Sequence, residues 1–477
     1  MLFNSFEFAL FLPIVFILYW LVVNKDLRFQ NGLLLMAGYI FYGFWDYRFL
    51  LLLAFSTLLD FISGIQIHRS VTPRYRKCWF WLSIGINLGL LGVFKYYNFF
   101  IGSVYELLSG LGIHLSHLTI SVILPVGISF YTFHGLSYII DIYNRKIEPE
   151  LNFINYSVFV CFFPLLVAGP IERAHHLLPQ IKQRRIFVYA KAVDGMRQIL
   201  WGLVKKIVIA DSCAIYVNKV FDHSGGFSGS TLLLAAVLFA FQIYCDFSGY
   251  SDIAIGTAKL FGISLLQNFS FPYFSRNIAE FWRRWHMSLT SWFRDYVYIP
   301  LGGSKGSRSK TVRNVFIIFL LSGFWHGANW TFLAWGFLNA LYFMPLLLLK
   351  KNRNYIDTVA SGTHLPSIRE FMQMSTTFLL TVLAWVFFRS GSIQEACQYL
   401  NGIFSFSFFS FPDNFPQTTI ILVCIFLIIE WMQRLKEHPL QFNHLWPRYL
   451  RWVTYYGLLM MLYIFGGKQQ PFIYFKF

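Results

Sequence analysis

Apolar segments long enough to cross a lipid bilayer recur along the whole chain, and this feature constrains the fold more than any other. A helix needs about 20 mostly apolar residues to cross the hydrocarbon core. Candidate segments lie at 6–23, 31–45, 48–66, 79–97, 120–140, 152–170, 190–213, 231–250, 313–349, 371–388, 418–432 and 450–466. We therefore predict an all-α polytopic membrane protein with about 11 transmembrane helices plus re-entrant and interfacial helices.

The composition indicates that lipid, rather than water, is the main solvent of this chain. Of 477 residues, 56% are hydrophobic and only 13% are charged, whereas about 25% of the residues in an ordinary soluble domain are charged. The apolar runs continue from the first residues to the last without a polar domain between them. We expect a single integral membrane domain over 1–477.

Lysine and arginine (39) outnumber aspartate and glutamate (22), which in a soluble protein would suggest nucleic-acid binding. Here the basic residues cluster in short loops between apolar runs, where the positive-inside rule places them. We therefore expect contacts with membrane lipids and no nucleic-acid partner. The six cysteines are scattered without a CxxC pair, so the sequence predicts neither a disulfide nor a metal site.

The loops also predict an orientation. Basic clusters at 69–77 and 276–313 should face the cytoplasm, whereas the loops at 101–119, 217–230 and 401–417 are poor in lysine and arginine and should lie on the other side. With these assignments both termini fall outside. The first apolar segment has no basic residue before it and no small-x-small cleavage site after it, so we expect a retained span rather than a signal peptide.

Two segments do not fit a simple crossing. The segment 152–170 has basic loops on both sides and contains Pro164 and a Gly169-Pro170 break, which favours a re-entrant or broken segment inside protein or beside a wet cavity. The run between Arg313 and Lys350 also has basic ends. At 1.5 Å per residue it is about 54 Å long, short of the roughly 60 Å needed for two full crossings. A broken hairpin therefore fits it best.

The middle of this hairpin reads SGFWHGANW and carries His326. A helical path from Arg313 places His326 roughly 20 Å inside the cytoplasmic edge. An ionisable residue at this depth is expensive and indicates function, and histidine suits general-base work near neutral pH. The alternative is a neutral histidine hydrogen-bonded to a neighbouring helix. Gly323 and Gly327 allow close backbone approach, and Trp325 and Trp330 supply rigid apolar walls.

A second motif, FWRRWHMSLTSWFRDYVYIPLGGS, covers 281–304. Aromatic residues, among them Trp282 and Trp285, alternate with arginines, as is typical of an amphipathic helix at the cytoplasmic interface. His286 lies one turn beyond Trp282 in the same expected helix and could point inwards. The arginines either anchor the helix among lipid headgroups or bind an anionic cofactor.

Asp246 and Asp252 lie near the end of an apolar run, in the segment CDFSGYSDIAIGTAKLFGI (245–263). Two carboxylates in a membrane segment could bind a cation or a proton. The alternative, which we favour, is that they cap helix ends or neutralise nearby arginines.

These motifs, in this order, resemble the membrane-bound O-acyltransferase (MBOAT) family, in the bacterial branch that includes the alginate O-acetyltransferase membrane protein. The matching segments are LPVGISFYTFHGLSYIIDIY (124–143), FFPLLVAGPIER (162–173), QNFSFPYFSRNIAEFWRRWHMSLTSWFRDYVYIPLGGS (267–304), SGFWHGANWTFLAWG (322–336) and the ending PFIYFKF. The resemblance covers most of the chain and implies a signature core at about 120–350. Its most specific part is FWRRWHMSLTSWFRDYVYIPLGG followed by WHGANW.

The resemblance implies roles for particular residues. The family's catalytic histidine matches His326, and its second signature histidine matches His286. The family fold implies a central tunnel at His326 within a ring of helices, and we expect these residues to line the tunnel or contact substrate: Trp325, Asn329, Trp330, Trp282, Trp285, Asp246 and Asp252. The donor is an acyl thioester, acetyl-CoA by family analogy, and its phosphates would contact Arg283, Arg284, Lys305 and Arg308. No tightly bound cofactor and no metal is expected.

The resemblance also implies acetyl transfer from a cytoplasmic donor towards an extracytoplasmic polysaccharide, from the bacterial cytoplasmic (inner) membrane. The expected partners are a periplasmic or extracellular acetyltransferase and a CoA or acyl-carrier donor. Acetyl export for peptidoglycan O-acetylation and D-alanyl transfer to teichoic acid remain open within the family. From other classes, a proton-coupled transporter or flippase would need pseudo-symmetric broken helices, which we do not find, and a purely structural scaffold leaves His326 without a purpose.

Overall fold

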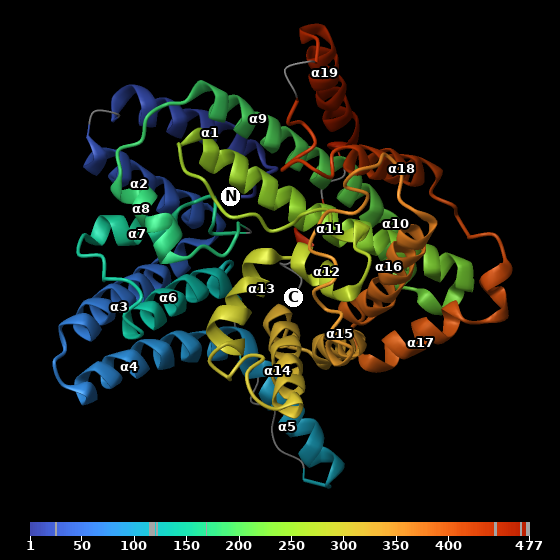
Figure 1. The fold of residues 1–477 in the computed structure, drawn as a ribbon, viewed down its shortest axis with the longest axis horizontal. Helices are drawn as coiled ribbons and strands as arrows, with labels where there is room; N and C mark the ends of the chain where they lie inside the picture. The colour runs from blue at the N-terminus through green and yellow to red at the C-terminus, as the bar shows by residue number, and fades with distance from the viewer. Residues whose placement is uncertain are drawn as a thin grey trace. The chain divides into compact units, whose positions relative to one another are not determined.

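The computed structural model describes residues 1–23, 26–113, 120, 123–167, 169–442, 446–467 and 470–473. Within these residues the secondary structure is helical and contains no strand (Figure 1). The all-α prediction is therefore confirmed. The last four residues of the PFIYFKF motif lie outside the described residues.

The described chain forms two compact units, residues 1–192 with 257–266 and residues 193–256 with 267–477. We refer to them as unit 1 and unit 2. Two long helices, α9 (Tyr189–Leu203) and α11 (Gly229–Leu260), belong mainly to unit 2 and pass into unit 1 at one end. The expectation of one functional membrane domain stays a prediction.

Unit 1 contains the first eight α-helices. They are α1 (Phe6–Ile17), α2 (Leu27–Asp46), α3 (Leu50–Arg69), α4 (Pro73–Leu91), α5 (Tyr97–Gly110), α6 (Ile128–Tyr143), α7 (Phe153–Cys161) and α8 (Ala174–Lys182), with π segments η1 (Leu18–Val22) and η3 (Gly92–Tyr96) and the 3-10 turn η2 (Tyr47–Phe49). Helices α3, α4 and α6 pack against one another. Because α5 runs to Gly110, half of the loop predicted at 101–119 is helical, and 114–119 lie outside the described residues.

The segment 152–170 is broken, as predicted. Helix α7 has only nine residues and reaches about 14 Å, which is less than half of the hydrocarbon core. After it the chain leaves the helical path, and the side chains of Phe162, Phe163 and Leu165 are fully buried. This irregular backbone lies within protein, as the membrane requires.

Unit 2 contains the remaining α-helices. Besides α9 and α11 they are α10 (Asp211–Phe221), α12 (Ile278–Arg284), α13 (Met287–Phe293), α14 (Arg308–His326), α15 (Trp330–Leu348), α16 (Ile368–Arg389), α17 (Ile393–Ile403), α18 (Gln417–Met432) and α19 (Arg448–Phe465). The π segments η4 (Val204–Ala210) and η7 (Arg294–Tyr298) and the 3-10 turns η5 (Ser224–Gly226), η6 (Pro272–Phe274) and η8 (Phe406–Phe409) lie between them.

Five helical segments among the described residues are long and apolar enough to cross a membrane: Leu27–Arg69, Pro73–Gly110, Gly229–Leu260, Trp330–Leu348 and Ile368–Arg389. Phe6–Val22 and Gln417–Met432 are apolar but shorter. Other predicted spans are helical but carry charge: Lys205 and Lys206 in η4, Lys310 and Arg313 in α14. The protein is thus a multi-pass membrane protein in which some helices carry charged side chains.

The predicted hairpin at 313–349 is confirmed as α14 and α15, separated by only three residues. The two helices pack closely because a glycine of each helix faces the backbone of the other helix. A Cβ on Gly323 would lie 2.2 Å from the Phe332 carbonyl oxygen, and one on Gly336 would lie 2.3 Å from that of Phe319. Any larger side chain at either position would push the helices apart.

Candidate functional site

His326 is the last residue of α14, and its side chain is buried, with 3% of the residue exposed. The helix ends there because Gly327 is extended, and a Cβ on Gly327 would collide with the Phe332 ring. The His326 ring lies 5.3 Å from that of Trp335 and 5.2 Å from that of Phe388, both roughly edge to face. The hairpin therefore delivers an imidazole into a rigid aromatic surrounding supplied by α15 and α16.

The structure corrects one prediction about the segment 281–304. It is not one amphipathic helix, because α12 ends at Arg284 and α13 begins at Met287. His286 lies at the break with φ 43° and ψ 54°, in the left-handed region of backbone conformation that residues other than glycine rarely adopt. Trp285 is fully buried rather than interfacial. The strain at His286 persists only where the surroundings hold it, and such strain is concentrated at functional sites.

Asn268 holds this break in place. Its backbone carbonyl accepts a hydrogen bond from Met287 N at 2.8 Å, and its side-chain oxygen accepts one from Ser288 Oγ at 2.6 Å. Its amide donates to Ser251 Oγ on α11 at 2.9 Å. Asn268 thus fixes both residues that follow His286 and ties them to α11.

The structure brings His286 and His326 together. Their ring centroids are 6.5 Å apart, and Trp325 contacts both rings, at 5.9 Å and 4.9 Å. His286 is 1% exposed, and neither of its ring nitrogens has a hydrogen-bond partner among the residues that the structure describes. A buried imidazole without a partner is destabilising by about 1–3 kcal/mol. This cost points to a ligand or water that His286 binds.

Asp246 and Asp252 are neutralised by buried lysines, not by the arginines that the sequence suggested. Asp252 pairs with Lys205 at 2.5 Å, and Asp246 pairs with Lys206 at 2.9 Å. Lys206 also pairs with Asp211 at 2.9 Å. Both lysines come from η4, where the wider π turn places two consecutive residues against α11. The favoured reading, charge neutralisation, fits these contacts.

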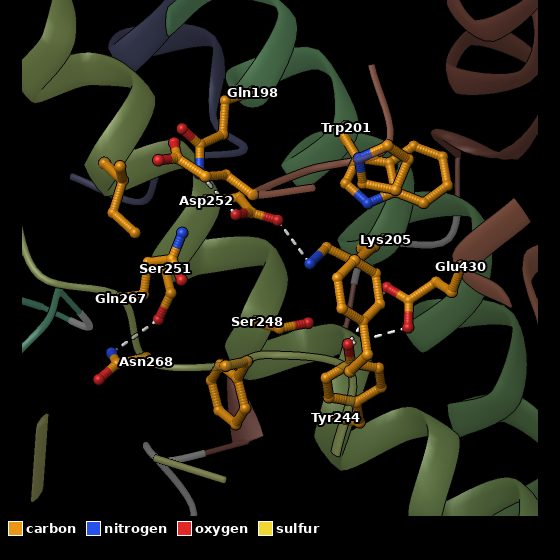
Figure 2. A pocket seen from close by; sticks show the side chains of 15 residues that line it. Gln198, Trp201, Lys205, Tyr244, Ser248, Ser251, Asp252, Gln267, Asn268 and Glu430 are labelled. Atoms are coloured by element: carbon orange, nitrogen blue, oxygen red, sulfur yellow. Dashed lines mark hydrogen bonds and ion pairs between the residues drawn. The ribbon is translucent and has the colours of Figure 1, made fainter. Parts of the chain in front are cut away.

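Next to this network lies a small polar chamber, drawn in Figure 2, with a volume of about 20 Å³. Lys205, Asp252 and Glu430 face it, and the Tyr244 hydroxyl donates to Glu430 at 2.9 Å. The volume suits about one water molecule. Within the described residues, no group of three or more His, Cys, Asp or Glu is arranged to hold a metal.

A second opening in unit 2 is a groove of about 490 Å³. Its buried lining residues, which we call the floor, include the apolar Trp282, Val315 and Phe319. Its exposed lining residues, which we call the rim, include Arg283, Arg294 and Arg353. The Trp282 ring contacts that of Trp335 at 5.6 Å, and Trp335 contacts His326. Two ring contacts therefore connect the groove wall to His326.

The four cations predicted to bind donor phosphates have different surroundings. Arg283 lines the groove and donates to the carbonyls of Asn352, at 2.7 Å, and of Tyr355. Arg284 is paired with Glu280 at 3.0 Å. Lys305 and Arg308 are exposed, and Arg308 donates to the Leu348 carbonyl. The structure thus places only Arg283 of the four in the groove lining.

Two predicted tunnel residues lie at the start of α15. The Asn329 side chain accepts from Thr331 N at 3.0 Å and donates to the Gly391 carbonyl, so it caps the helix. Trp330 is 52% exposed. Their substrate roles stay predictions.

Sequence reasoning missed several residues that shape the site. Lys205 and Lys206 had a visible signal, because GLVKKIVIA places two cations inside an apolar run. Glu430, inside the apolar run that forms α18, had the same signal. Trp335, Phe388 and Asn268 had none, since their importance comes only from which residues they contact.

Comparison with known proteins defines the class of the molecule. A model of the MBOAT (membrane-bound O-acyltransferase) family matches residues 143–383, half of the chain, which includes both histidines. A multi-pass helical protein with this match is a membrane-embedded O-acyltransferase. The protein named probable alginate O-acetylase AlgI in Pseudomonas aeruginosa is 37% identical over 92% of this chain and 83% of its own length. The chain belongs to the membrane-bound O-acyltransferase family.

Two other relatives show the range of activities around this fold. The peptidoglycan O-acetyltransferase of Helicobacter pylori is 32% identical over 100% of this chain and 98% of its own length. The teichoic acid D-alanyltransferase of Bacillus subtilis is 29% identical over 45% of this chain and 57% of its own length. All three relatives are named for the transfer of a short acyl group.

Proposed function

We propose that this protein takes an acetyl group from a cytoplasmic thioester donor and passes it across the bacterial inner membrane for O-acetylation of an extracytoplasmic polysaccharide of the alginate type. The observation that carries the proposal is the buried, facing pair of His286 and His326 in an aromatic surrounding. The names of the relatives that match over most of the chain support acetyl as the acyl group and a polysaccharide as the acceptor.

His326 acts as the general base in this proposal. It takes the proton of an acceptor hydroxyl while the hydroxyl oxygen attacks the thioester carbonyl, so that a C–O bond forms. The tetrahedral intermediate then expels the thiolate as the C–S bond breaks, and the imidazolium of His326 returns the proton to sulfur. The aromatic rings around His326 exclude water that would otherwise hydrolyse the thioester.

His286 polarises the thioester carbonyl. A neutral imidazole carries one N–H donor, and a donor aimed at the developing oxyanion stabilises the transition state. Both ring nitrogens of His286 lack partners among the described residues, so a donor is available without the loss of a protein contact. The strained backbone that Asn268 holds keeps this imidazole at a fixed position facing His326.

The groove beside Trp282 is the donor entrance in this proposal. Its arginine rim suits phosphates, because guanidinium groups bind them with paired hydrogen bonds. Its apolar floor suits a flexible thioester arm, and the Trp282 indole N–H, which has no partner within the described chain, can donate to an amide of that arm. Arg294 and Arg353 join Arg283 on the rim, and either acetyl-CoA or an acyl carrier would present a phosphorylated arm.

Delivery to the polymer requires a partner in this proposal. The partner is a separate periplasmic or extracellular acetyltransferase that receives the acetyl group and transfers it to the polysaccharide. Peptidoglycan O-acetylation is the second candidate, because the H. pylori relative matches this chain over nearly the full length of both proteins.

The test uses the purified protein in proteoliposomes with [¹⁴C]acetyl-CoA outside and oligosaccharide acceptors inside. Mannuronate oligomers, peptidoglycan fragments and buffer alone are compared, with the His175→Ala variant as a control for loss of an exposed histidine. We expect label on luminal mannuronate oligomers only when the partner acetyltransferase is enclosed with them. Label on peptidoglycan fragments alone would favour peptidoglycan O-acetylation. If neither acceptor is labelled and the acetyl-CoA remains unhydrolysed, the result would contradict acetyl transfer.

A further inference from the structure

A cavity in unit 1 lies far in sequence from both histidines. It has a volume of about 550 Å³ and is formed where α3 and α6 end and α4 begins. Its lining side chains include His68, Ser70, Arg76, Arg145, Lys146 and Glu148. None of these residues has a part in the acyl-transfer mechanism proposed above.

The cavity is electropositive. Three of its lining residues are cationic at neutral pH, Arg76, Arg145 and Lys146, and one, Glu148, is anionic. Lys146 is paired with the buried Asp141 at 3.4 Å, and Arg76 donates to the Tyr143 carbonyl. These contacts hold the side chains of Lys146 and Arg76 at the cavity wall, and Arg145 is exposed.

Arg145 occupies a backbone position that favours glycine. Helix α6 ends in a Schellman motif, in which Lys146 N donates to the Asp141 carbonyl at 2.8 Å and Arg145 N donates to that of Ile142 at 3.0 Å. The residue at this C′ position is left-handed, and Arg145 has φ 57°. An arginine therefore stands where glycine would be more stable, so the backbone conformation does not account for its side chain.

We propose that this cavity binds the phosphate of an anionic lipid headgroup. Two guanidinium groups and an ammonium are the groups that recognise phosphate in proteins. The surroundings favour a lipid over a soluble phosphate, because Val71, next to Ser70, and Tyr75, in the first turn of α4, are 95% and 68% exposed. Exposed apolar and aromatic side chains beside a basic site are typical of the membrane interface, where they contact acyl chains and headgroups.

The Arg145→Gly variant distinguishes phosphate binding by Arg145 from a purely structural role of this residue. Glycine suits the left-handed position, so the helix end should be at least as stable as in the wild type. The variant nevertheless removes one cation from the cavity. Its control is Lys77→Gln, which removes an exposed cation from the same cytoplasmic cluster but from outside the cavity lining.

The experiment measures lipid binding by native mass spectrometry of the full-length protein in detergent micelles doped with phosphatidylglycerol or phosphatidylcholine, together with the Tm of each variant. We expect phosphatidylglycerol to be retained in preference to phosphatidylcholine. In Arg145→Gly its affinity should fall about fivefold, the effect of one cation near an anionic headgroup, while the Tm in lipid-free detergent is unchanged or higher. In Lys77→Gln the affinity should change less than about twofold, because an exposed charge outside the site is screened.

Three results would overturn the proposal. Equal retention of the two lipids would show that there is no anionic-lipid site. Equal weakening by Arg145→Gly and Lys77→Gln would show that the attraction comes from the cytoplasmic charge as a whole rather than from this cavity. Displacement of phosphatidylglycerol by millimolar inorganic phosphate would show that the ligand is a soluble phosphate.

Discussion

Two regions of unit 2 bury ionisable side chains, and they do so in opposite ways. Around Lys205 and Lys206 each buried cation has a carboxylate partner within 3 Å. His286 has no partner among the described residues, lies in a strained backbone conformation and faces His326 across apolar rings. In the first region each buried lysine has a partner of opposite charge. In the second region the two ring nitrogens of His286 have no hydrogen-bond partner among the described residues.

The difference teaches how to separate structural from chemical sites in a membrane protein. Burial alone does not distinguish them, because both regions are almost fully buried. A compensated pair is stable only as a unit and has little capacity left for a substrate. An uncompensated and strained imidazole is unfavourable until something binds to it, and such a group is available for catalysis.

The largest expected effect on activity outside His326 itself is that of His286→Asn. Asparagine tolerates the left-handed conformation, so the variant should fold with a Tm close to that of the wild type. Because the shorter asparagine amide cannot place an N–H where the imidazole N–H lies, we expect kcat for acyl transfer to fall by about 10²- to 10³-fold. A radiolabel assay on matched amounts of folded protein measures this, and a kcat within twofold of the wild type would break the comparison.

The opposite behaviour is expected for Lys206→Met. Removing this cation leaves Asp246 and Asp211 buried without it, which destabilises the folded state by about 3–5 kcal/mol. The Tm should therefore fall strongly, while the activity per folded molecule stays within about twofold. The double variant Lys206→Met with Asp246→Asn should recover part of the loss.

If instead Lys206→Met keeps its Tm and loses activity, the lysine network takes part in the function. That result would favour proton coupling and revive the transporter alternative.

A smaller effect is expected for Asn268→Ala, which removes a positioning residue. Two buried serine hydroxyls each lose a hydrogen bond to Asn268, so stability should fall by about 1–3 kcal/mol. Because His286 is then held less firmly, kcat should fall about tenfold with little change in the KM for the thioester. The control is Asn87→Ala, which removes a buried amide bonded to Asp60 in unit 1 and should lower Tm without changing kcat.

The smallest effect is expected for Asp357→Asn, which tests an ion pair at the surface. The hydrogen bond from Arg276, at 3.1 Å, lowers the pKa of the Asp357 carboxyl. Because the Asp357 side chain is 60% exposed, its loss should change the stability by only about 0–1 kcal/mol. A lowered pKa stabilises the fold above the unfolded-state pKa and loses this contribution as the pH falls through the folded-state pKa. The Tm values of variant and wild type should therefore converge in acid.

The sequence predicted those features that follow from length and from glycine and proline. The hairpin around His326 followed from counting residues between Arg313 and Lys350, and the broken segment at 152–170 followed from Pro164 and its basic flanks. The first prediction depends on the thickness of the hydrocarbon core, and the second depends on the way proline breaks a helix.

The features that the sequence did not predict depend on backbone geometry or on distant contacts. A left-handed histidine has no sequence signal, so the motif around His286 read as one helix. The π turn that places Lys205 and Lys206 side by side against α11 has no signal either. Asn268 lies in a loop, and only the structure shows that its side chain accepts a hydrogen bond from Ser288.

The central claim is that His326 is the base of an acyl transfer, and one measurement tests it most directly. Purified wild type, His326→Ala and His175→Ala, matched for folding by Tm, are incubated with radiolabelled acetyl-CoA, the partner acetyltransferase and acceptor. We expect label to reach the acceptor with wild type and His175→Ala and to fall by at least about 10²-fold with His326→Ala. If His326→Ala transfers label as fast as the wild type, His326 is a structural histidine and the proposed mechanism is wrong.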